Sequence, residues 1–414
     1  MSGRQTGPSW IDAAEAARLL RVSRATLYAY VSRGFVRSQS TAGPSRRRRY
    51  SREDVERLQR RTEERRDPAK AAARALQWGV PVLESSIALI DGAALYYRGH
   101  DAVQLARTRS VAEVASLIWT SSFETRFKAL LWRSATTLPG LRNDAPASRS
   151  DRSLPFAARA QSMLARAAAH DPQAFDLRPA SVALTGWRIL ALLTQAATAG
   201  RPSADTVEAT LARAWRVGAS GADLLRAALI LCADHELNVS SFTARCVASA
   251  GSNPYAVVTA GLAALEGTRH GGTGARVEAV MDSMRRARSL RIAIGERMKR
   301  GEPIDGFGHP LYHGGDPRAT ALLELLRERY AASAELRFTL DFADAAGAAL
   351  RERPNIDFAL AALTRVLRLP PGSPLTLFGI GRSIGWIGHA IEQYATGQLI
   401  RPRAKYVGVP PAVA

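Results

Sequence analysis

The chain has 414 residues, 46% of them hydrophobic, and its 57 Lys and Arg against 37 Asp and Glu give a formal net charge of +20. This composition excludes an intrinsically disordered chain, and two cysteines, Cys232 and Cys246, are too few for a disulfide scaffold or a cysteine-based zinc site. No apolar run approaches the ~18 residues of a membrane span, and residues 1–9 lack the apolar stretch of a secretory signal, so we expect a soluble, cytoplasmic protein. The length predicts several domains, and we expect no metal site.

The first 66 residues form a basic segment. They hold 16 Arg, no Lys and only 7 acidic residues. Guanidinium groups suit phosphates and guanine edges, so this segment favours an anionic partner such as DNA. The alternative is that an arginine-rich genome supplies arginine wherever a cation is needed.

Two short helices are predicted near the start of this segment. Asp12 is a good N-cap for an amphipathic helix over residues 13–20, and Ser23 caps a second helix that reaches Val31. Gly34 stands where a C′ glycine belongs. Two helices joined by a short turn form a helix-turn-helix, whose second helix can enter the major groove of DNA.

A wing and a third helix are predicted next. Residues 35–36 begin an extended stretch, residues 41–44 form a turn, the arginines of 46–49 return as a basic strand, and Ser51 caps another helix. The segments 13–20, 23–28 and 48–55 resemble the winged helix-turn-helix of the MerR and excisionase families. The predicted DNA-contacting residues are Ser23, Arg24, Thr26, Tyr28, Arg46, Arg47, Arg48 and Arg49. Tyr28 and its neighbour Tyr30 suit a core position equally well.

The rest of the chain reads as helical. Residues 67–78 are predicted to be a linker, and residues 79–414 are rich in Ala, Leu and Arg with helical periodicity. Predicted helices cover residues 158–169, 204–217, 319–332 and 341–351. Gly218 is expected to cap the second of these at its C-terminus, Gly92 to turn a short hairpin within 82–97, and residues 138–156 to form a surface loop.

Four of the seven histidines fall in three conspicuous segments. These are residues 232–238 with His235, residues 267–272 with His270, and residues 306–313 with His309 and His313. The glycines beside His270 and His309 allow a ligand or another backbone to approach closely. In a fourth segment, residues 354–358, Asp357 stands at an apolar helix start, where burial can tune the pKa of its carboxyl group. His389 follows an apolar helix stretch and is more typical of a core residue.

These four segments, in this order, resemble citrate synthase. Further matching stretches are residues 84–87, 90–92, 97–99, 378–386 and 401–403, and the resemblance covers about residues 79–408. It implies an all-α fold with a large subdomain built from about 79–268 and 362–414 and a small one from about 269–361, working as a homodimer. We therefore predict a citrate synthase-like two-subdomain helical fold (79–414) preceded by a small winged helix-turn-helix domain (1–66).

The resemblance also implies a reaction. The family joins the methyl carbon of acetyl-CoA to the ketone of oxaloacetate and then hydrolyses the thioester, with no cofactor besides the acetyl-CoA substrate. Asp357 matches the general base, His270 the partner of the thioester oxygen, and His309 the group that polarises the ketone. The residues matching the dicarboxylate site are His235, Arg318, Arg382 and Arg401, the last reaching into the neighbouring subunit's site.

Some positions depart from the family pattern. Pro310 and His313 stand where the family commonly has basic residues near the CoA phosphates, and Arg297, Lys299 and Arg300 just upstream could replace them. Thr268 and Thr273-Gly274 also differ from the common residues.

Two readings of the function, from different classes, stay open. The first is an enzyme that makes citrate or, from propionyl-CoA, 2-methylcitrate; these substrates differ by one methylene, worth only ~1–3 kcal/mol in a binding site. The second is a transcription regulator that uses a citrate synthase-like domain as a metabolite sensor. A simpler possibility is that the N-terminal segment is an oligomerisation or docking module.

Overall fold

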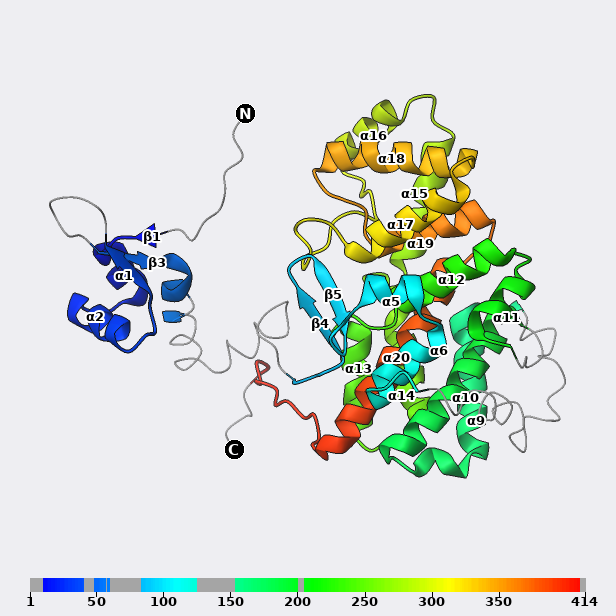
Figure 1. The fold of residues 1–414 in the computed structure, drawn as a ribbon, viewed down its shortest axis with the longest axis horizontal. Coiled ribbons are helices and arrows are strands. Elements are labelled where there is room, and N and C mark those ends of the chain that lie inside the picture. The colour runs from blue at the N-terminus through cyan, green and yellow to red at the C-terminus, as the bar shows by residue number, and fades with distance from the viewer. Residues whose placement is uncertain are drawn as a thin grey trace. The chain divides into compact units, whose positions relative to one another are not determined.

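The computed structural model describes residues 10–40, 48–56, 58–59, 83–124, 153–199 and 205–409. The chain divides into two compact units, Met1–Glu84 and Ser85–Ala414 (Figure 1). Each unit has its own hydrophobic core. The predicted linker 67–78 lies outside the described residues, so the predicted domain boundaries stay predictions.

The first unit is a small helix-turn-helix with a three-stranded antiparallel sheet in the order β1-β3-β2. Its elements are β1 (Trp10–Ile11), α1 (Ala13–Leu20), α2 (Arg24–Ser32), β2 (Ser38–Ser40), β3 (Arg48–Ser51) and helical residues 52–56 and 58–59. The predicted caps are confirmed: the Asp12 carboxylate accepts from the N–H groups of Ala14 and Glu15, and the Ser23 hydroxyl accepts from that of Thr26. Gly34 follows α2 with φ +74°, as expected of a C′ glycine.

The wing differs slightly from the prediction. The strand β2 begins at Ser38 rather than at residue 35, because the N–H of Phe35 still bonds the carbonyl of Tyr30 and closes the end of α2. The buried carboxylate of Asp54 then accepts from the backbone N–H of Arg37 at 2.9 Å and from its Nε at 2.7 Å. This double contact ties the start of the wing to the third helix. The predicted turn 41–44, with Arg46 and Arg47, lies outside the described residues.

The second unit is almost entirely helical after one small sheet. That sheet holds β4 (Ala88–Asp91), β5 (Ala94–Tyr97) and β6 (His100–Asp101), with the predicted hairpin turning at Gly92. The helices are α5 (Ala102–Thr108), α6 (Val111–Thr120), α9 (Phe156–His170), η1 (Pro172–Phe175), α10 (Pro179–Thr198), α11 (Val207–Ala214), α12 (Ala219–Leu231), α13 (Val239–Ser249), α14 (Pro254–Leu265), α15 (Thr273–Arg285), α16 (Leu290–Lys299), α17 (Pro317–Tyr330), α18 (Ala334–Leu350), α19 (Ile356–Leu367) and α20 (Ser373–Thr396).

The helices form two groups around α20. In Figure 1, α15 to α18 gather at one end of the unit, and α9, α10 and α14 pack toward the other end. The long helix α20 packs against α10, α12, α13 and α14, and α19 bridges from α17 and α15 to α20. This arrangement agrees with the two helical bodies that the resemblance implies; their boundaries at about residues 269 and 361 stay predictions.

Glycines explain how closely α20 can be packed. A Cβ atom at Gly381 would stand 2.5 Å from the carbonyl oxygen of Leu229, and one at Gly385 would stand 2.4 Å from the Asp234 carboxylate. Real side chains cannot approach so closely, so only glycine lets α20 lie directly on the chain that follows α12. Arg382 sits between these two glycines and is thereby brought to the end of α12.

One predicted cap is wrong and one helix starts earlier than predicted. Helix α11 ends at Ala214, its C-terminal turn is completed by Arg216 at φ +56°, and extended Gly218 instead precedes α12. Helix α18 begins at Ala334 rather than at residue 341 because Ser333 caps it. The predicted loop 138–156 lies mostly outside the described residues. No helix in the described ranges combines the length and apolarity that crossing a bilayer requires.

Candidate active site

His235 lies in a tight turn between α12 and α13. The hydroxyl of Tyr97 stands 3.1 Å from the carbonyl oxygen of Ile230 and 3.2 Å from that of Asp234, and so holds the turn from β5. Glu236 takes a left-handed φ of +51°, a conformation that costs energy for a residue with a Cβ and is often kept at functional sites. The turn therefore presents a buried His235 side chain under local constraint.

His270 lies in the loop between α14 and α15. The N–H of Gly271 bonds the carbonyl of Leu265 at 2.9 Å, and a Cβ atom at Gly271 would stand 2.7 Å from that same oxygen. The glycine beside His270 thus allows close approach of another backbone. The Nε2 atom of His270 lies 2.9 Å from the hydroxyl of Ser240, which also accepts from the indole N–H of Trp386 at 3.2 Å.

His309 follows a loop that is pinned to the start of α19. The N–H of Gly308 bonds the carbonyl of Arg353 at 2.8 Å, and the N–H of Asn355 bonds that of Gly306 at 2.9 Å. Both glycines have positive φ, at +95° for Gly306 and +74° for Gly308. The Nδ1 atom of His309 accepts from a backbone N–H at 3.2 Å, which assigns the proton of the neutral ring to Nε2.

Arg318 is fully buried, and its charge is paired with the carboxylate of Asp316. Its Nε and Nη2 atoms donate to Asp316 at 2.9 and 2.8 Å, and the same carboxylate accepts from the N–H of Ile356 at 3.0 Å. Burial opposes the charge, but Asp316 more than offsets it, so the pKa of Arg318 is raised. Asp316 therefore joins the N-terminus of α17 to that of α19, where Asp357 follows at once.

Arg382 is the second buried guanidinium. Its Nε donates to the carbonyl of Cys232 at 2.7 Å, and its carbon atom Cζ lies 4.6 Å from the centre of the Phe378 ring. Its Nη2 atom is buried and has no hydrogen-bond partner among the described residues. A charged donor left without a partner is costly, so the observation points to an anionic ligand for this atom.

The side chains meet in one cluster. Ring centres of His235 and His309 are 5.0 Å apart, and Tyr312 lies 5.0 Å from His309 and 5.5 Å from His235. Arg382 acts electrostatically on His235, His270 and Asp357. The candidate site, as the name is used below, consists of His235, His270, His309, Arg318, Asp357 and Arg382.

The electrostatics of the candidate site divide its residues into two kinds. Burial, with Arg382 adding, lowers the pKa of His270 to about 4, and burial with Arg318 lowers that of His309 to about 4. The pKa of His235 is also lowered, chiefly by burial. Burial raises the pKa of Asp357 to about 6. At neutral pH the site thus holds neutral imidazoles, a basic carboxylate and two fixed cations.

Two residues contact histidines of the candidate site although no role was predicted for them. The hydroxyl of Tyr312 lies 3.0 Å from Nε2 of His235, and Ser240 contacts His270. The only sequence signal for Tyr312 is its place three residues after His309. Ser240 is five residues from His235 and has no local signal.

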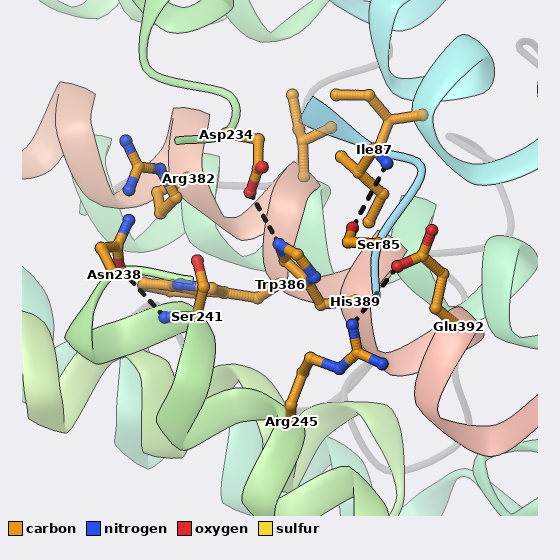
Figure 2. A network of polar contacts seen from close by, with 12 residues as sticks. Ser85, Ile87, Asp234, Asn238, Ser241, Arg245, Arg382, Trp386, His389 and Glu392 are labelled. Atoms are coloured by element: carbon orange, nitrogen blue, oxygen red, sulfur yellow. Dashed lines mark hydrogen bonds and ion pairs between the residues drawn. The ribbon is translucent and has the colours of Figure 1, made fainter. Parts of the chain in front are cut away.

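Behind the site lies the polar network of Figure 2. The predicted core residue His389 is fully buried, and its Nε2 atom lies 3.1 Å from the Asp234 carboxylate, next to His235 in the chain. One turn further along α20, Glu392 pairs with Arg245. Through Asp234, the network holds the turn that carries His235 against α20.

Other predicted residues lie elsewhere. Arg401 is exposed in the segment after α20, five residues beyond the end of that helix. In the first unit, Ser23, Arg24 and Tyr28 are exposed at the start of α2, Thr26 is half-buried against Ser23, and Arg48 and Arg49 are exposed on β3. Tyr30 packs partly against the core, so only Tyr28 is presented to solvent. No three His, Cys, Asp or Glu of the described residues group as metal ligands.

Both units match known protein families. Residues 75–403 match the family model "Citrate synthase, C-terminal domain", and residues 10–63 match a helix-turn-helix domain. The chain is 30% identical to the citrate synthase of Haloferax volcanii over 358 residues, which cover 80% of this chain and 94% of that protein.

Shorter matches are somewhat more similar. A putative citrate synthase 2 of Mycobacterium tuberculosis is 36% identical over 186 residues, 43% of this chain and 49% of that protein. A 2-methylcitrate synthase 2 of Corynebacterium glutamicum is 33% identical over 183 residues, 44% of this chain and 48% of that protein. The matching segment thus spans about half the length of these two relatives.

Solved structures agree with the fold. Citrate synthase from Thermotoga maritima superposes with a TM-score of 0.67 at 25% identity, covering 81% of this chain and 96% of that one. The ternary complex of the Thermoplasma acidophilum enzyme with carboxymethyl coenzyme A and oxaloacetate gives a TM-score of 0.68 at 24% identity, covering 81% and 96%. With the family model matching most of its length, the chain belongs to the citrate synthase family and carries a helix-turn-helix domain at its N-terminus.

Proposed function

We propose that this protein condenses acetyl-CoA with oxaloacetate and hydrolyses the resulting thioester to citrate and free CoA. The observation that carries the proposal is the meeting of Asp357, whose pKa is raised to about 6, with neutral His270 and His309 and two buried arginines. A carboxylate with such a pKa is a better base at neutral pH than an ordinary aspartate.

The chemistry divides naturally among these groups. Asp357 takes a proton from the thioester methyl group, and a neutral imidazole of His270 donates a hydrogen bond to the enolate oxygen. The methylene carbon attacks the ketone carbon while the Nε2–H of neutral His309 donates a hydrogen bond to the ketone oxygen, and the uptake of one proton by the resulting alkoxide balances the proton that Asp357 removed. Water then adds to the thioester carbonyl and the C–S bond breaks, which gives a carboxylate, the CoA thiol and one released proton.

The dicarboxylate is held by the cations. Arg318 and Arg382 supply planar guanidinium groups for its two carboxylates, and the unpartnered Nη2 of Arg382 gains an acceptor when one binds. His235 completes this part of the site beside Arg318. Arg401 is proposed to act across a homodimer on the neighbouring subunit's ligand, as its exposure in a single chain allows.

The acyl-CoA is the open variable. Relatives named 2-methylcitrate synthase match this chain almost as well as those named citrate synthase. Propionyl-CoA, giving 2-methylcitrate, is therefore the alternative substrate. Positions 310 and 313 lack the basic residues that are common in the family near the CoA phosphates. Arg297 donates to the carbonyl of Pro303 and Arg300 to the carboxylate of Glu302, so neither simply replaces them.

The first unit favours a second role beside the enzymatic one. Its predicted recognition helix presents Arg24 and Tyr28 to solvent, and the neighbouring strand β3 presents Arg48 and Arg49. Cations and an aromatic side chain on these two elements suit a DNA groove and its phosphates. We propose that this unit binds DNA, either to regulate transcription or to tether the enzyme.

The test measures thiol release by the purified full chain. Oxaloacetate is supplied with acetyl-CoA and, separately, with propionyl-CoA, and Asp357→Asn is the matched variant because it keeps shape and loses the base. Turnover with either thioester that the variant loses by ~100-fold or more supports the enzyme. Absence of turnover with both, together with retained binding of oxaloacetate, would contradict it and leave the sensor.

A further inference from the structure

One side chain outside the candidate site touches both loops that carry its catalytic histidines. Arg276, in the first turn of α15, donates from Nε and Nη2 to the two carboxylate oxygens of Asp305 at 3.1 and 3.0 Å. Its Nη1 donates to the carbonyl of Thr268, and its Nη2 lies 3.2 Å from the hydroxyl of Thr273. All three nitrogens of the guanidinium are thus engaged.

The partners of Arg276 locate its role. Thr268 lies two residues before His270, and Asp305 lies immediately before Gly306, at the start of the loop that presents His309. The same cation acts on Asp357, and Asp357 acts on it in return. Arg276 therefore bonds the loops that carry His270 and His309 and acts electrostatically on Asp357, the three residues proposed to carry out the chemistry. It does so although it is 29 residues from Asp305 along the chain.

We propose that Arg276, with Asp305, is a positioning residue that clasps the His270 loop to the His309 loop and so fixes the distance between the two imidazoles across the reacting carbons. This inference rests on the proposed condensation and deepens it. Only a guanidinium can do this, because its planar fork serves a carboxylate in two-point contact and a carbonyl at the same time.

The clasp is a matter of geometry more than of stability. The Arg276 side chain is 41% exposed, so its ion pair with Asp305 is screened by water and adds little to folding. A misplacement of catalytic groups by a fraction of an ångström, in contrast, costs a large factor in rate. Removing the clasp should therefore leave the fold intact and lower turnover.

The pKa of the Asp357 carboxyl gives a second readout, because Arg276 is one of the charges around it. The ionisable groups that interact with it are Arg318 of α17 and the N-cap Asp316 before it, Arg382 of α20, Arg276 of α15 and the thiol of Cys232 after α12. The three arginines each lower the pKa of the Asp357 carboxyl, and Asp316 raises it. Arg318 and Arg382 are assigned to the substrate. Arg276 is the cation that can be replaced without removing a dicarboxylate ligand.

The experiment compares Arg276→Ala, Arg276→Lys and Asp305→Asn with the full-length wild type, and uses Arg107→Ala as the control. Arg107 also forms a partly exposed two-carboxylate pair, with Glu324 and Glu328, but joins α5 to α17 away from the two loops. Steady-state kcat and KM are measured against pH, and the Asp357 carboxyl is titrated by infrared difference spectroscopy, with Asp357→Asn assigning the band.

The clasp predicts a split between the variants. Arg276→Ala should lose ~10-fold or more in kcat, with KM for oxaloacetate within about twofold of wild type. Its acid limb and carboxyl titration should move to higher pH by about half a unit, since a neighbouring cation is gone. Arg276→Lys keeps the charge and should restore the acid limb without restoring kcat; Asp305→Asn should lose kcat as well. Arg107→Ala should match wild type.

Each contrary result has a distinct meaning. Wild-type kcat and an unmoved carboxyl titration in Arg276→Ala would overturn the clasp while the enzyme stands. A loss of kcat equal in Arg107→Ala would reduce it to general destabilisation and likewise overturn it. Wild type that turns over no acyl-CoA would contradict the proposed function and, with it, the clasp; the carboxyl titration, which does not require turnover, would then still show whether the Arg276 cation acts on Asp357.

Discussion

At the residue scale, burial shifts the pKa values of the carboxyl and imidazole groups in opposite directions, and both shifts favour the proposed chemistry. It disfavours charge on every group, so it raises the pKa of the Asp357 carboxyl and lowers those of His270 and His309. Near neutral pH the carboxylate is the strongest base among them, and the imidazoles are neutral donors. The division into one base and two hydrogen-bond donors follows mainly from desolvation, to which Arg382 and Arg318 add at the two histidines.

This division predicts the pH dependence of activity. As pH falls through about 6, the pKa of Asp357, the base takes a proton and kcat/KM should fall about tenfold per pH unit. Protonation of His270 and His309, with pKa values of about 4, comes at lower pH and should not shape this limb. Initial rates from about pH 5 to about pH 8 test this; a kcat/KM that stays nearly constant down to about pH 5, as the ordinary aspartate pKa of ~4 would give, would contradict it.

Tyr312 supplies a second prediction at this scale. Its hydroxyl lies 3.0 Å from Nε2 of His235 and is buried with it. Tyr312→Phe keeps the ring contacts with His235 and His309 but leaves that nitrogen without its partner. The Kd for oxaloacetate should rise roughly fivefold, about 1 kcal/mol, with the melting temperature nearly unchanged. Isothermal titration measures it, and an unchanged Kd would show that the contact is not needed for the ligand-binding form.

At the element scale, glycines decide where the loops can run. At Gly271 a Cβ atom would meet Leu265 and Leu375 at 2.7 Å, so Gly271→Ala must push the His270 loop away from α14 and α20. We expect a loss of about 1–3 kcal/mol in the free energy of unfolding. Turnover should fall further than this loss of stability explains, because His270 moves with the loop. Denaturant unfolding and thiol release on the same preparation separate the two effects.

Gly295 is the matched control for that substitution. It lies inside α16 with negative φ, and a Cβ atom there meets nothing within 4 Å. Gly295→Ala should therefore stabilise the protein by about 0.5–1 kcal/mol, through helix propensity, without changing turnover. If both variants behave alike, the close contacts at Gly271 are not the cause.

The same scale shows what sequence could predict and what it could not. The caps Asp12 and Ser23 act on N–H groups two or three residues away, so local chemistry was enough to place α1 and α2. Gly218 misled because glycine serves both ends of a helix, and Arg216 had already taken the left-handed turn. Local rules cannot tell which residue of a short run reverses the chain.

The site divides in the same way. His235, His270, His309 and Asp357 stand in motifs that could be matched one by one, and the structure brings them together with both buried arginines. The contacts of Tyr312 with His235 and of Ser240 with His270 span 77 and 30 residues. Such contacts depend on how loops are folded against one another, which no local pattern encodes.

At the scale of the whole molecule, the two units separate two kinds of surface. The second unit buries two of its arginines, Arg318 beside a carboxylate and Arg382 beside a backbone carbonyl, where they can take a small anion. The first unit places Arg48 and Arg49 in solvent on the wing strand, next to the exposed start of α2. Exposed cations on a wing and a recognition helix suit an extended polyanion, so we assign the proposed DNA binding to this unit.

The wing arginines give the last prediction. If Arg48 and Arg49 each contact one phosphate, the double variant Arg48→Ala/Arg49→Ala should weaken binding to every duplex sequence, and the slope of log K against log salt should fall by about 2, at ~0.9 per phosphate. Arg52→Ala is the control, since Arg52 is already paired with Glu15 and should leave the slope unchanged. Fluorescence anisotropy across a salt series measures both. Equal slopes in wild type and double variant would show that the wing does not touch the backbone, whereas an altered preference among sequences would mean that these arginines read bases rather than phosphates.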